Sequence, residues 1–177
     1  MSTGPLPRFL DPRKLADQGG TIRGDISVGE LPRLREFRES QQENVAVDLA
    51  FCRDEEGHHC VHGSVATRLV VQCQRCLEPL TLDLDARVTL ALAWGDDQMK
   101  ALPSEYDPWL INADQMPLAD LLEEEILLAL PAVAVHEHCP HGLMEENAED
   151  PSQDETETEK ENPFAVLAQL KKGDREE

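Results

Sequence analysis

The clearest pattern in this chain is the stretch LTLDLDARVTLALAW, which occupies residues 80–94. Leu, Ala, Val and Trp take the even positions, and Thr, Asp and Arg take the odd positions as far as residue 89. A period of two residues is typical of a β-strand that buries one face. The stretch therefore predicts a long strand with one side against a core and the other toward solvent.

Three further stretches carry strand patterns, and short connections separate them. Residues 45–51 (VAVDLAF) and 61–71 (VHGSVATRLVV) show the same alternation, and residues 21–27 show a weaker one. The segment Asp54 to Gly57 reads as a turn, because Gly57 can adopt a positive φ. Connections of turn length join neighbouring strands as hairpins, so we expect an antiparallel sheet.

One main helix is expected after the strands. Pro117 suits the start of a helix and Pro131 ends it. Acidic residues are expected on its solvent face, and its apolar stripe is expected to lie on the sheet. The outward set is Asp120, Glu123 and Glu124, whereas the stripe is Leu118, Leu121, Leu122, Ile126 and Ala129, with Glu125 beside it.

Weaker helix signals lie near the N-terminus. Asp11 followed by Pro12 predicts the start of a short helix, and residues 29–39 have apolar side chains at helical spacing. Together these elements predict an α+β fold. We expect an antiparallel β-sheet, a meander that could take a barrel-like form, covered by one main helix.

The chain divides into three predicted parts. Residues 1–144 are expected to form a single α+β domain, a normal outcome for a chain of 177 residues. Residues 145–161 hold nine Asp or Glu against one Lys, which predicts a disordered acidic linker. Residues 162–177 begin with Asn-Pro, which suits the start of a helix, so a short C-terminal helical motif and tail are expected.

The excess of acidic over basic residues indicates which class of macromolecule this chain can bind. Asp and Glu number 36 against 16 Lys and Arg, which gives a formal net charge of -20. Such a chain repels phosphate backbones on average, and no basic stripe with aromatic residues offsets this. A basic protein is therefore a better partner than bare nucleic acid, although acidity also serves solubility.

The expected location is the cytoplasm. No apolar run approaches the ~20 residues that a membrane helix needs. Residues 1–10 have no apolar stretch typical of a secretory signal. In the cytoplasm, five cysteines are expected to be reduced or metal-bound, and their odd number agrees with that.

Two cysteine-containing clusters suggest a metal site. Cys73 and Cys76 have the Cys-x-x-Cys spacing of a zinc knuckle, and His136 and Cys139 follow the expected helix with the same two-residue gap. The four would form a Cys3His set that leaves no open position, so one zinc ion there would be structural. The cysteines could equally stay reduced and empty. A redox pair is a third reading, although such pairs usually open a helix in a βαβ unit.

Other candidate sites are weaker. His58, Cys60 and His62 would share one strand face, but alternate residues of a strand lie too far apart to close on one ion without bending it. A hydrated face with incidental histidines is the preferred interpretation. No glycine-rich phosphate loop, G-x-S-x-G elbow or H-E-x-x-H motif is present.

Four motifs occur here in an order that resembles a known family. They are CQRCLEP (73–79), LLEEEILLALP (121–131), His136 with Cys139, and NPFAVLAQL (162–170). In this order and spacing they resemble the YceD family, the large ribosomal RNA subunit accumulation proteins. The resemblance covers roughly residues 73–172, and residues before it match only in general character. Some family members look richer in cysteine after the helix, and His136 stands where one such cysteine is expected.

The resemblance implies a bacterial cytoplasmic factor that is not an enzyme. Its role would lie in synthesis, processing or stability of 23S rRNA, hence in ribosome biogenesis. Given the acidity of the chain, we expect it to hold a basic ribosomal protein or an rRNA-processing factor, and to reach rRNA indirectly. The expected partner contact comprises Phe164, Val166, Leu167 and Leu170. The alternative is that this C-terminal helix folds back on its own domain, which a linker of this length allows.

Two alternatives belong to other classes. A metal-dependent RNA-processing enzyme would need an open coordination position and a cleft rich in Lys and Arg, and the scarcity of basic residues weighs against it. A redox module would use Cys73 and Cys76.

Overall fold

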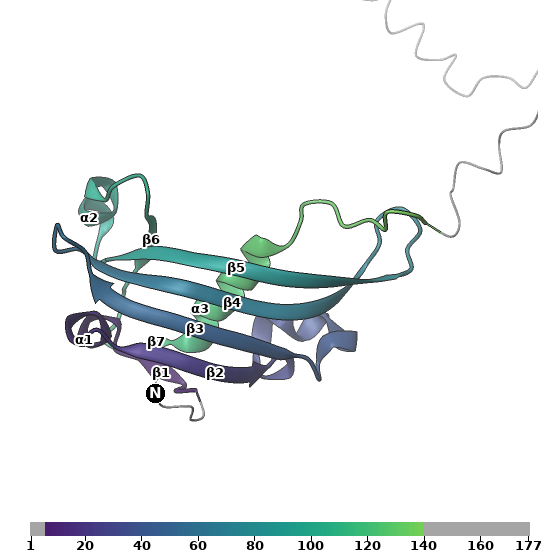
Figure 1. Ribbon diagram of the computed structural model, residues 1–177, viewed down its shortest axis with the longest axis horizontal. Helices are drawn as coiled ribbons and strands as arrows, with labels where there is room; N and C mark the ends of the chain where they lie inside the picture. Colours follow the sequence, from purple (N-terminus) through teal and green to yellow (C-terminus); the bar gives the residue numbers. More distant parts are fainter. Residues whose placement is uncertain (1–5, 140–177) are drawn as a thin grey trace, which may run out of the picture. The chain divides into compact units, whose positions relative to one another are not determined.

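A computed structural model describes residues 6–139 of the protein (Figure 1). Its centre is a five-stranded sheet in the order β2-β3-β4-β5-β6, and β1 pairs with β7 in a separate ribbon. The strands are β1 (Phe9–Leu10), β2 (Thr21–Ser27), β3 (Asn44–Arg53), β4 (His59–Gln72), β5 (Pro79–Ala93), β6 (Asp107–Leu110) and β7 (Met116–Pro117). The helices are α1 (Pro12–Gln18), α2 (Asp96–Ala101) and α3 (Leu118–Ala129), with 3-10 turns η1 (Val28–Glu30), η2 (Pro32–Glu36) and η3 (Arg38–Ser40). The expected α+β fold is confirmed.

The strand that the sequence marks most clearly, β5, has the longest pairing. Its antiparallel register with β4 runs without a break from Cys60–Ala91 to Gln72–Pro79. The alternation predicts the orientation correctly, because Leu84 and Val88 are buried whereas Asp83 and Asp85 are exposed. The strands β2, β3, β4 and β5 follow one another as antiparallel neighbours. Connections of turn length join β3 to β4 and β4 to β5, as expected for hairpins, whereas the 3-10 turns η1, η2 and η3 lie between β2 and β3.

The segment after β5 departs from the expected loop. It contains α2 and then β6, which pairs with β5 in parallel from Leu90–Asp107 to Ala93–Leu110. Four residues that include Pro108 carry no strand periodicity, so local sequence does not reveal β6. The sheet is therefore mixed at one edge. It also stays open, with β2 and β6 at opposite edges, rather than closing into a barrel.

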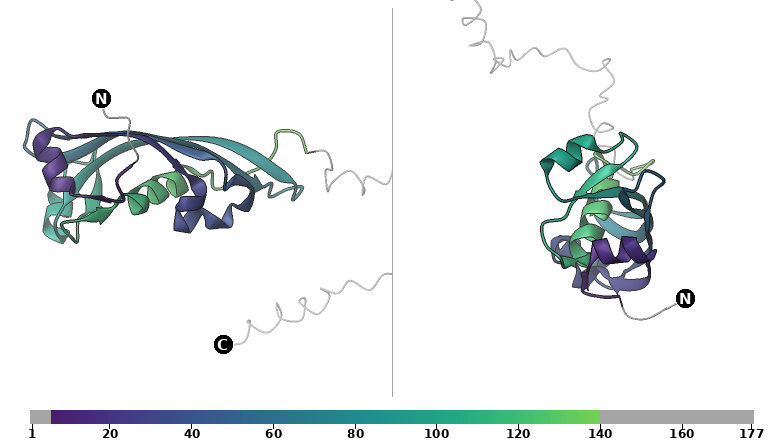
Figure 2. Two further views of the ribbon diagram at one scale, coloured as in Figure 1. Left: turned by 90° about the horizontal axis from the view of Figure 1, so that it is seen from below. Right: turned by 90° about the vertical axis from the view of Figure 1, so that its left-hand side faces the viewer.

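The core lies between the sheet and α3. Leu121, Leu122 and Ile126 of α3 are buried against the inner face of the sheet, where Phe51 and Leu69 are also buried. Figure 2 shows α3 and the 3-10 turns on this same face, while the other face of the sheet lies open along most of its length. No helix among residues 6–139 is long and apolar enough to cross a membrane.

The helix expected at residues 29–39 is a series of 3-10 turns instead. Pro32 opens η2, the preceding Leu31 supplies no cap from its own side chain, and Leu31 and Leu34 are completely buried. Pro32 lacks an N–H and restricts the residue before it, which breaks any continuous helix through this stretch. Leu31 and Leu34 are thus buried, but the segment does not form the expected α-helix.

Glu123 corrects a second expectation, because it faces the core rather than solvent. Its side chain is 2 % exposed, and its Oε1 accepts a hydrogen bond of 2.8 Å from the backbone N–H of Arg33. This N–H lies in the first turn of η2, where backbone donors have no partner within the turn. The carboxylate of Glu123 thus caps η2 from a distant helix.

Replacing Glu123 tests this cap. Glu123→Ala should lower the free energy of unfolding by about 2–3 kcal/mol, because the N–H of Arg33 loses its acceptor and a cavity opens. Glu123→Gln keeps an oxygen acceptor and should cost less. Urea denaturation of these variants, with the exposed Glu124→Ala as matched control, measures the effect. Equal losses at positions 123 and 124 would contradict a buried cap.

Gly63 lies in β4 at a place where β3 comes very close. Its φ is +155°, and it is the register partner of Leu49. A Cβ at this position would fall well inside the contact distance of the carbonyl oxygen of Asp48. The pairing of β3 with β4 therefore depends on the absence of a side chain at residue 63.

Candidate metal centre

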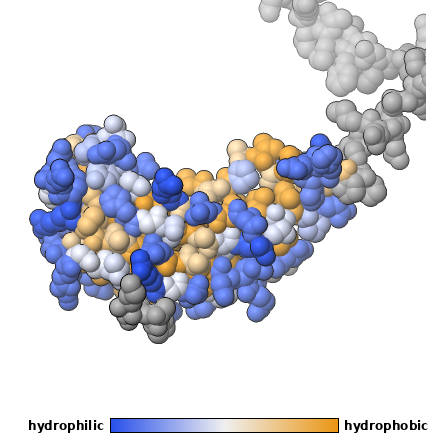
Figure 3. Space-filling model, in the orientation of Figure 1, coloured by the Kyte–Doolittle hydropathy of each residue, from blue (hydrophilic) through white to orange (hydrophobic). Residues whose placement is uncertain are grey.

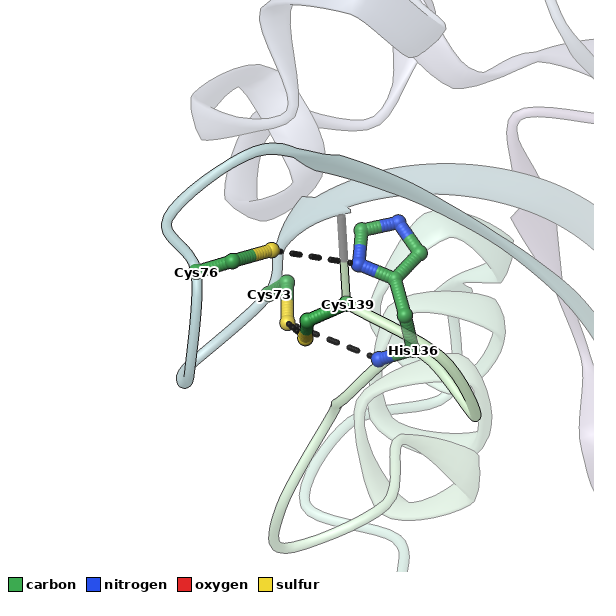
Figure 4. A group of neighbouring side chains, drawn as sticks. All are labelled: Cys73, Cys76, His136 and Cys139. Atoms are coloured by element: carbon green, nitrogen blue, oxygen red, sulfur yellow. Dashed lines mark hydrogen bonds between the residues drawn. The ribbon is translucent and has the colours of Figure 1, made fainter. Parts of the chain in front are cut away.

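The first half of the candidate centre is the turn between β4 and β5. Cys73 continues the inward-facing register of β4, and its backbone N–H donates to the carbonyl of Glu78 at 2.9 Å. The N–H of Leu77 donates back to the carbonyl of Cys73, also at 2.9 Å. Leu77 adopts a φ of +64°, which closes the turn tightly. The turn brings the sulfur atoms of Cys73 and Cys76 to the same side (Figure 4).

The second half comes from the segment that follows α3. Leu130 caps α3 with an extended conformation, and Pro131 stops the helix from continuing. The chain then runs to the β4–β5 turn, where the N–H of Gln74 donates to the carbonyl of Ala134 at 2.9 Å. Ala134 is buried there, which fixes the segment against the turn.

These two halves place four possible ligands together. Cys73, Cys76, His136 and Cys139 each offer one ligand atom, and the four atoms lie within 4.8 Å of one another. Within residues 6–139, this is the one such group of three or more His, Cys, Asp or Glu. All of its cysteines are free thiols. The structure thus brings together the four residues that the sequence singles out.

Two of the six distances between the ligand atoms match the edges of a tetrahedron around zinc. Zn–S bonds of about 2.3 Å and Zn–N bonds of about 2.0–2.1 Å give S–S edges of about 3.8 Å and S–N edges of about 3.5 Å. The Sγ atoms of Cys73 and Cys139 are 3.7 Å apart, and the Sγ of Cys76 lies 3.4 Å from Nδ1 of His136. The donor set and these edges both fit Zn²⁺.

His136 is held in the orientation that a metal ligand needs. Its Nε2 lies 3.1 Å from the carbonyl oxygen of Pro79. A carbonyl can only accept, so Nε2 carries the proton and Nδ1 keeps its lone pair toward the sulfur atoms. Such a contact behind a histidine ligand fixes both the ring and its tautomer.

Arg75 supplies a positive charge beside the sulfur atoms. Its Nε donates to the Sγ of Cys139 at 2.8 Å, and its guanidinium also donates to the carbonyl of His136 at 2.9 Å. The contact with Cys139 raises the pKa of Arg75. Three thiolates around one divalent cation leave one net negative charge, which Arg75 can balance. The role of Arg75 was not predicted from the sequence, and its place inside the Cys-x-x-Cys turn was the available signal.

The thiols do not ionise alike. Burial opposes ionisation of Cys73, but backbone N–H groups of Cys76, His136 and Arg75 lower its pKa to about 5. The N–H of Glu78 favours the thiolate of Cys76, yet burial and the sulfur atoms of Cys73 and Cys139 outweigh it and raise the pKa of Cys76. Neighbouring thiolates repel one another, which makes it costly to ionise all three thiols. A bound divalent cation offsets this repulsion.

The remaining candidates lie apart from this centre. Of the two further histidines near His136, His138 is exposed and His141 lies outside the described residues. The partner-contact residues and the predicted linker and tail, residues 145–177, also lie outside them. Cys73 and Cys76 lie in a hairpin turn rather than at the start of a helix.

The segment with His58, Cys60 and His62 does not form the expected hydrated face. Cys60 is completely buried, and the ring of His62 packs 5.9 Å from that of Tyr106. The segment that carries Tyr106 folds over this face, and burial raises the pKa of Cys60. His58 contacts Asp54 at 2.8 Å instead of pointing toward Cys60 and His62. These residues do not converge on one point.

Comparisons with known proteins point to one family. The family described as "Large ribosomal RNA subunit accumulation protein YceD" matches residues 61–171. A relative of the same name from Haemophilus influenzae is 33 % identical over 169 residues, which cover 94 % of this chain and 96 % of the relative. No solved structure matches this chain.

Proposed function

The chain belongs to the YceD family of large ribosomal RNA subunit accumulation proteins, and from this membership we propose that it is a cytoplasmic, non-catalytic ribosome assembly factor. It would support synthesis, processing or stability of 23S rRNA by holding a basic ribosomal protein or an rRNA-processing factor. The family match over residues 61–171 carries this proposal. The net charge of -20 favours a basic protein over bare RNA as the direct contact.

The metal centre enters the proposal as a structural part. One Zn²⁺ bound by Cys73, Cys76, His136 and Cys139 would tie the β4–β5 turn to the segment after α3. Four protein ligands leave no position for water or substrate, which distinguishes such a site from a catalytic zinc site. This closed donor set gives the ion a structural rather than a catalytic role.

Recovery of the tagged protein from its own cells tests the function. Large-subunit ribosomal proteins or a processing factor should co-purify, and they should remain after nuclease treatment because protein contacts hold them. Loss of every protein with nuclease, together with precursor rRNA in the untreated eluate, would instead establish RNA as the direct partner. Purified protein that cleaves precursor rRNA, with loss of cleavage on chelation, would overturn the non-catalytic role.

The C-terminal motif is tested in the same experiment. Replacing both Phe164 and Leu167 by Ala should lower partner recovery at least about tenfold, since buried apolar anchors dominate such contacts. Circular dichroism and thermal melting should show an unchanged fold. Undiminished recovery by the double variant would exclude this motif from partner binding.

A further inference from the structure

The outer edge of β5 lacks a partner strand along most of its length. On one side β5 pairs with β4 throughout, but on the other it pairs with β6 only from Leu90 to Ala93. Between Thr81 and Thr89, no strand among residues 6–139 lies on that edge (Figure 1). An unpaired strand edge of this length is a template for another strand.

The backbone groups that face this edge can be assigned. The N–H of Ile111, just after β6, donates to the carbonyl of Ala93 at 2.8 Å, so the polar groups of Ala93 point outward. Backbone groups alternate along a strand, and the register with β4 has no bulge. The outward N–H and C=O groups therefore belong to odd-numbered residues. Within the open stretch these are Thr81, Asp83, Asp85, Arg87 and Thr89.

An apolar surface lies next to the open edge. Helix α3 crosses beneath the sheet and emerges beyond β5 (Figure 1), where the side chain of Leu128 is 75 % exposed. Val133 follows it with 62 % exposed. Figure 3 shows apolar side chains gathered at this place, which borders the open edge. A strand added to β5 would cover this surface with its inward side chains.

The charge at the end of this edge nearest β6 is negative. Asp107 and Glu124 are exposed, and the partly buried Glu125 lies close to both of them. Burial raises the pKa of Glu125, and the carboxylates of Asp107 and Glu124 raise it further. Three carboxyl groups thus lie near one another at the junction of α3 and β6. A cationic side chain placed here would gain from all of them.

We propose that the open edge of β5 binds an extended segment of a basic protein, which presents apolar residues together with Lys or Arg on the face that meets α3. Backbone hydrogen bonds to Thr81–Thr89 would hold the segment. On the face toward α3, apolar side chains would cover Leu128, and a cationic side chain nearer β6 would face the carboxylates of Asp107, Glu124 and Glu125. A second copy of this chain fits less well, because it would bring the same carboxylates against their own counterparts. The inference rests on the proposed function, since it names where and how a basic partner is bound.

A titration with a synthetic peptide tests the edge directly. The probe is about nine residues long, the length that the open edge can pair, and it carries valine and lysine on the face that would meet α3, with threonine at the alternate positions. Full-length wild-type protein should bind it, and binding should weaken as salt is raised. Asp85→Pro removes one outward N–H without affecting the β4 ladder, so affinity should fall at least about tenfold while the fold remains. The control Asp85→Ala keeps the backbone and should lose less.

Several outcomes would overturn the inference. Equal peptide affinity of wild-type and folded Asp85→Pro protein would show that the edge is not the site. Concentration-dependent dimers in sedimentation, abolished by Asp85→Pro, would assign the edge to a second copy. The peptide could also bind only after Phe164 and Leu167 are replaced by Ala. That result would show that the chain's own C-terminal segment occupies the β5 edge in the wild-type protein.

Recovery from cells separates this inference from the proposed function. If Asp85→Pro protein recovers the same ribosomal proteins as wild type, the function stands and the edge is excluded. If neither protein recovers them, the proposed function itself fails. Loss of recovery only in Asp85→Pro, with the fold intact, supports both.

Discussion

Zinc in the purified protein should fall from about one equivalent to a small fraction of that when Cys73 is replaced by Ser. Cys73 is completely buried at the centre of the cluster, and its Sγ lies 3.7 Å from that of Cys139. Serine offers a poor ligand with a shorter bond, so the remaining three residues could not close the tetrahedron. Elemental analysis of protein prepared without chelator measures the change.

The same replacement should reduce stability. A ligand that binds only the folded state at a thousand times its Kd contributes about 4 kcal/mol, which corresponds to about 10 °C in Tm for a chain of this size. A chelator should lower the Tm of the wild-type protein by a similar amount and leave Cys73→Ser unchanged. Cys52→Ser is the matched control, because Cys52 is free and lies outside the cluster.

Two results would refute the metal centre. Wild-type protein with zinc well below one equivalent would show that the four residues remain unoccupied. Full zinc retention in Cys73→Ser would place the ion elsewhere. Either result would leave the family membership and the fold unaffected.

Gly63→Ala should be among the most destabilising single substitutions in the sheet. A Cβ at Gly63 would overlap the carbonyl oxygen and carbon of Asp48, which are backbone atoms of β3 that no rotamer change can move. The positive φ of +155° adds strain for any L side chain. We expect a loss of about 3 kcal/mol or more, a large fraction of the stability of an ordinary domain.

Thermal and urea unfolding measure this loss. Gly95→Ala is the control, because a Cβ there would meet no atom within 4 Å. Tm should fall by about 10 °C at position 63 and hardly change at position 95. Similar melting of both variants would mean that β3 and β4 can move apart at no cost, contrary to the register through Leu49.

Much of the fold could be predicted because its signals are local. The alternation along residues 80–94 sets the inward face of β5, and two prolines bound α3. Each half of the metal centre could be identified from ligand type and spacing alone. The two halves meet because residues 131–139 run back to the β4–β5 turn. No local sequence pattern predicts this path.

Other features could not be predicted because their causes lie far along the chain. Glu123 looks like a surface residue of an acidic helix, and it is buried only because the N–H of Arg33 lies opposite. β6 is a strand only because the edge of β5 is available to it. Residues 29–39 keep helical spacing but turn more tightly around Pro32. In each case a tertiary contact overrides the local preference.

The pairing of β1 with β7 has a consequence for how the protein is made. Phe9 is the register partner of Pro117, so the first strand pairs with the last strand of the described residues. Synthesis proceeds from the N-terminus, and distant contacts form late because a long loop must close first. A nascent chain cannot complete this ribbon until residue 117 has left the ribosome. The protein therefore finishes folding late in its own translation, and β1 stays unpaired until β7 has been synthesised.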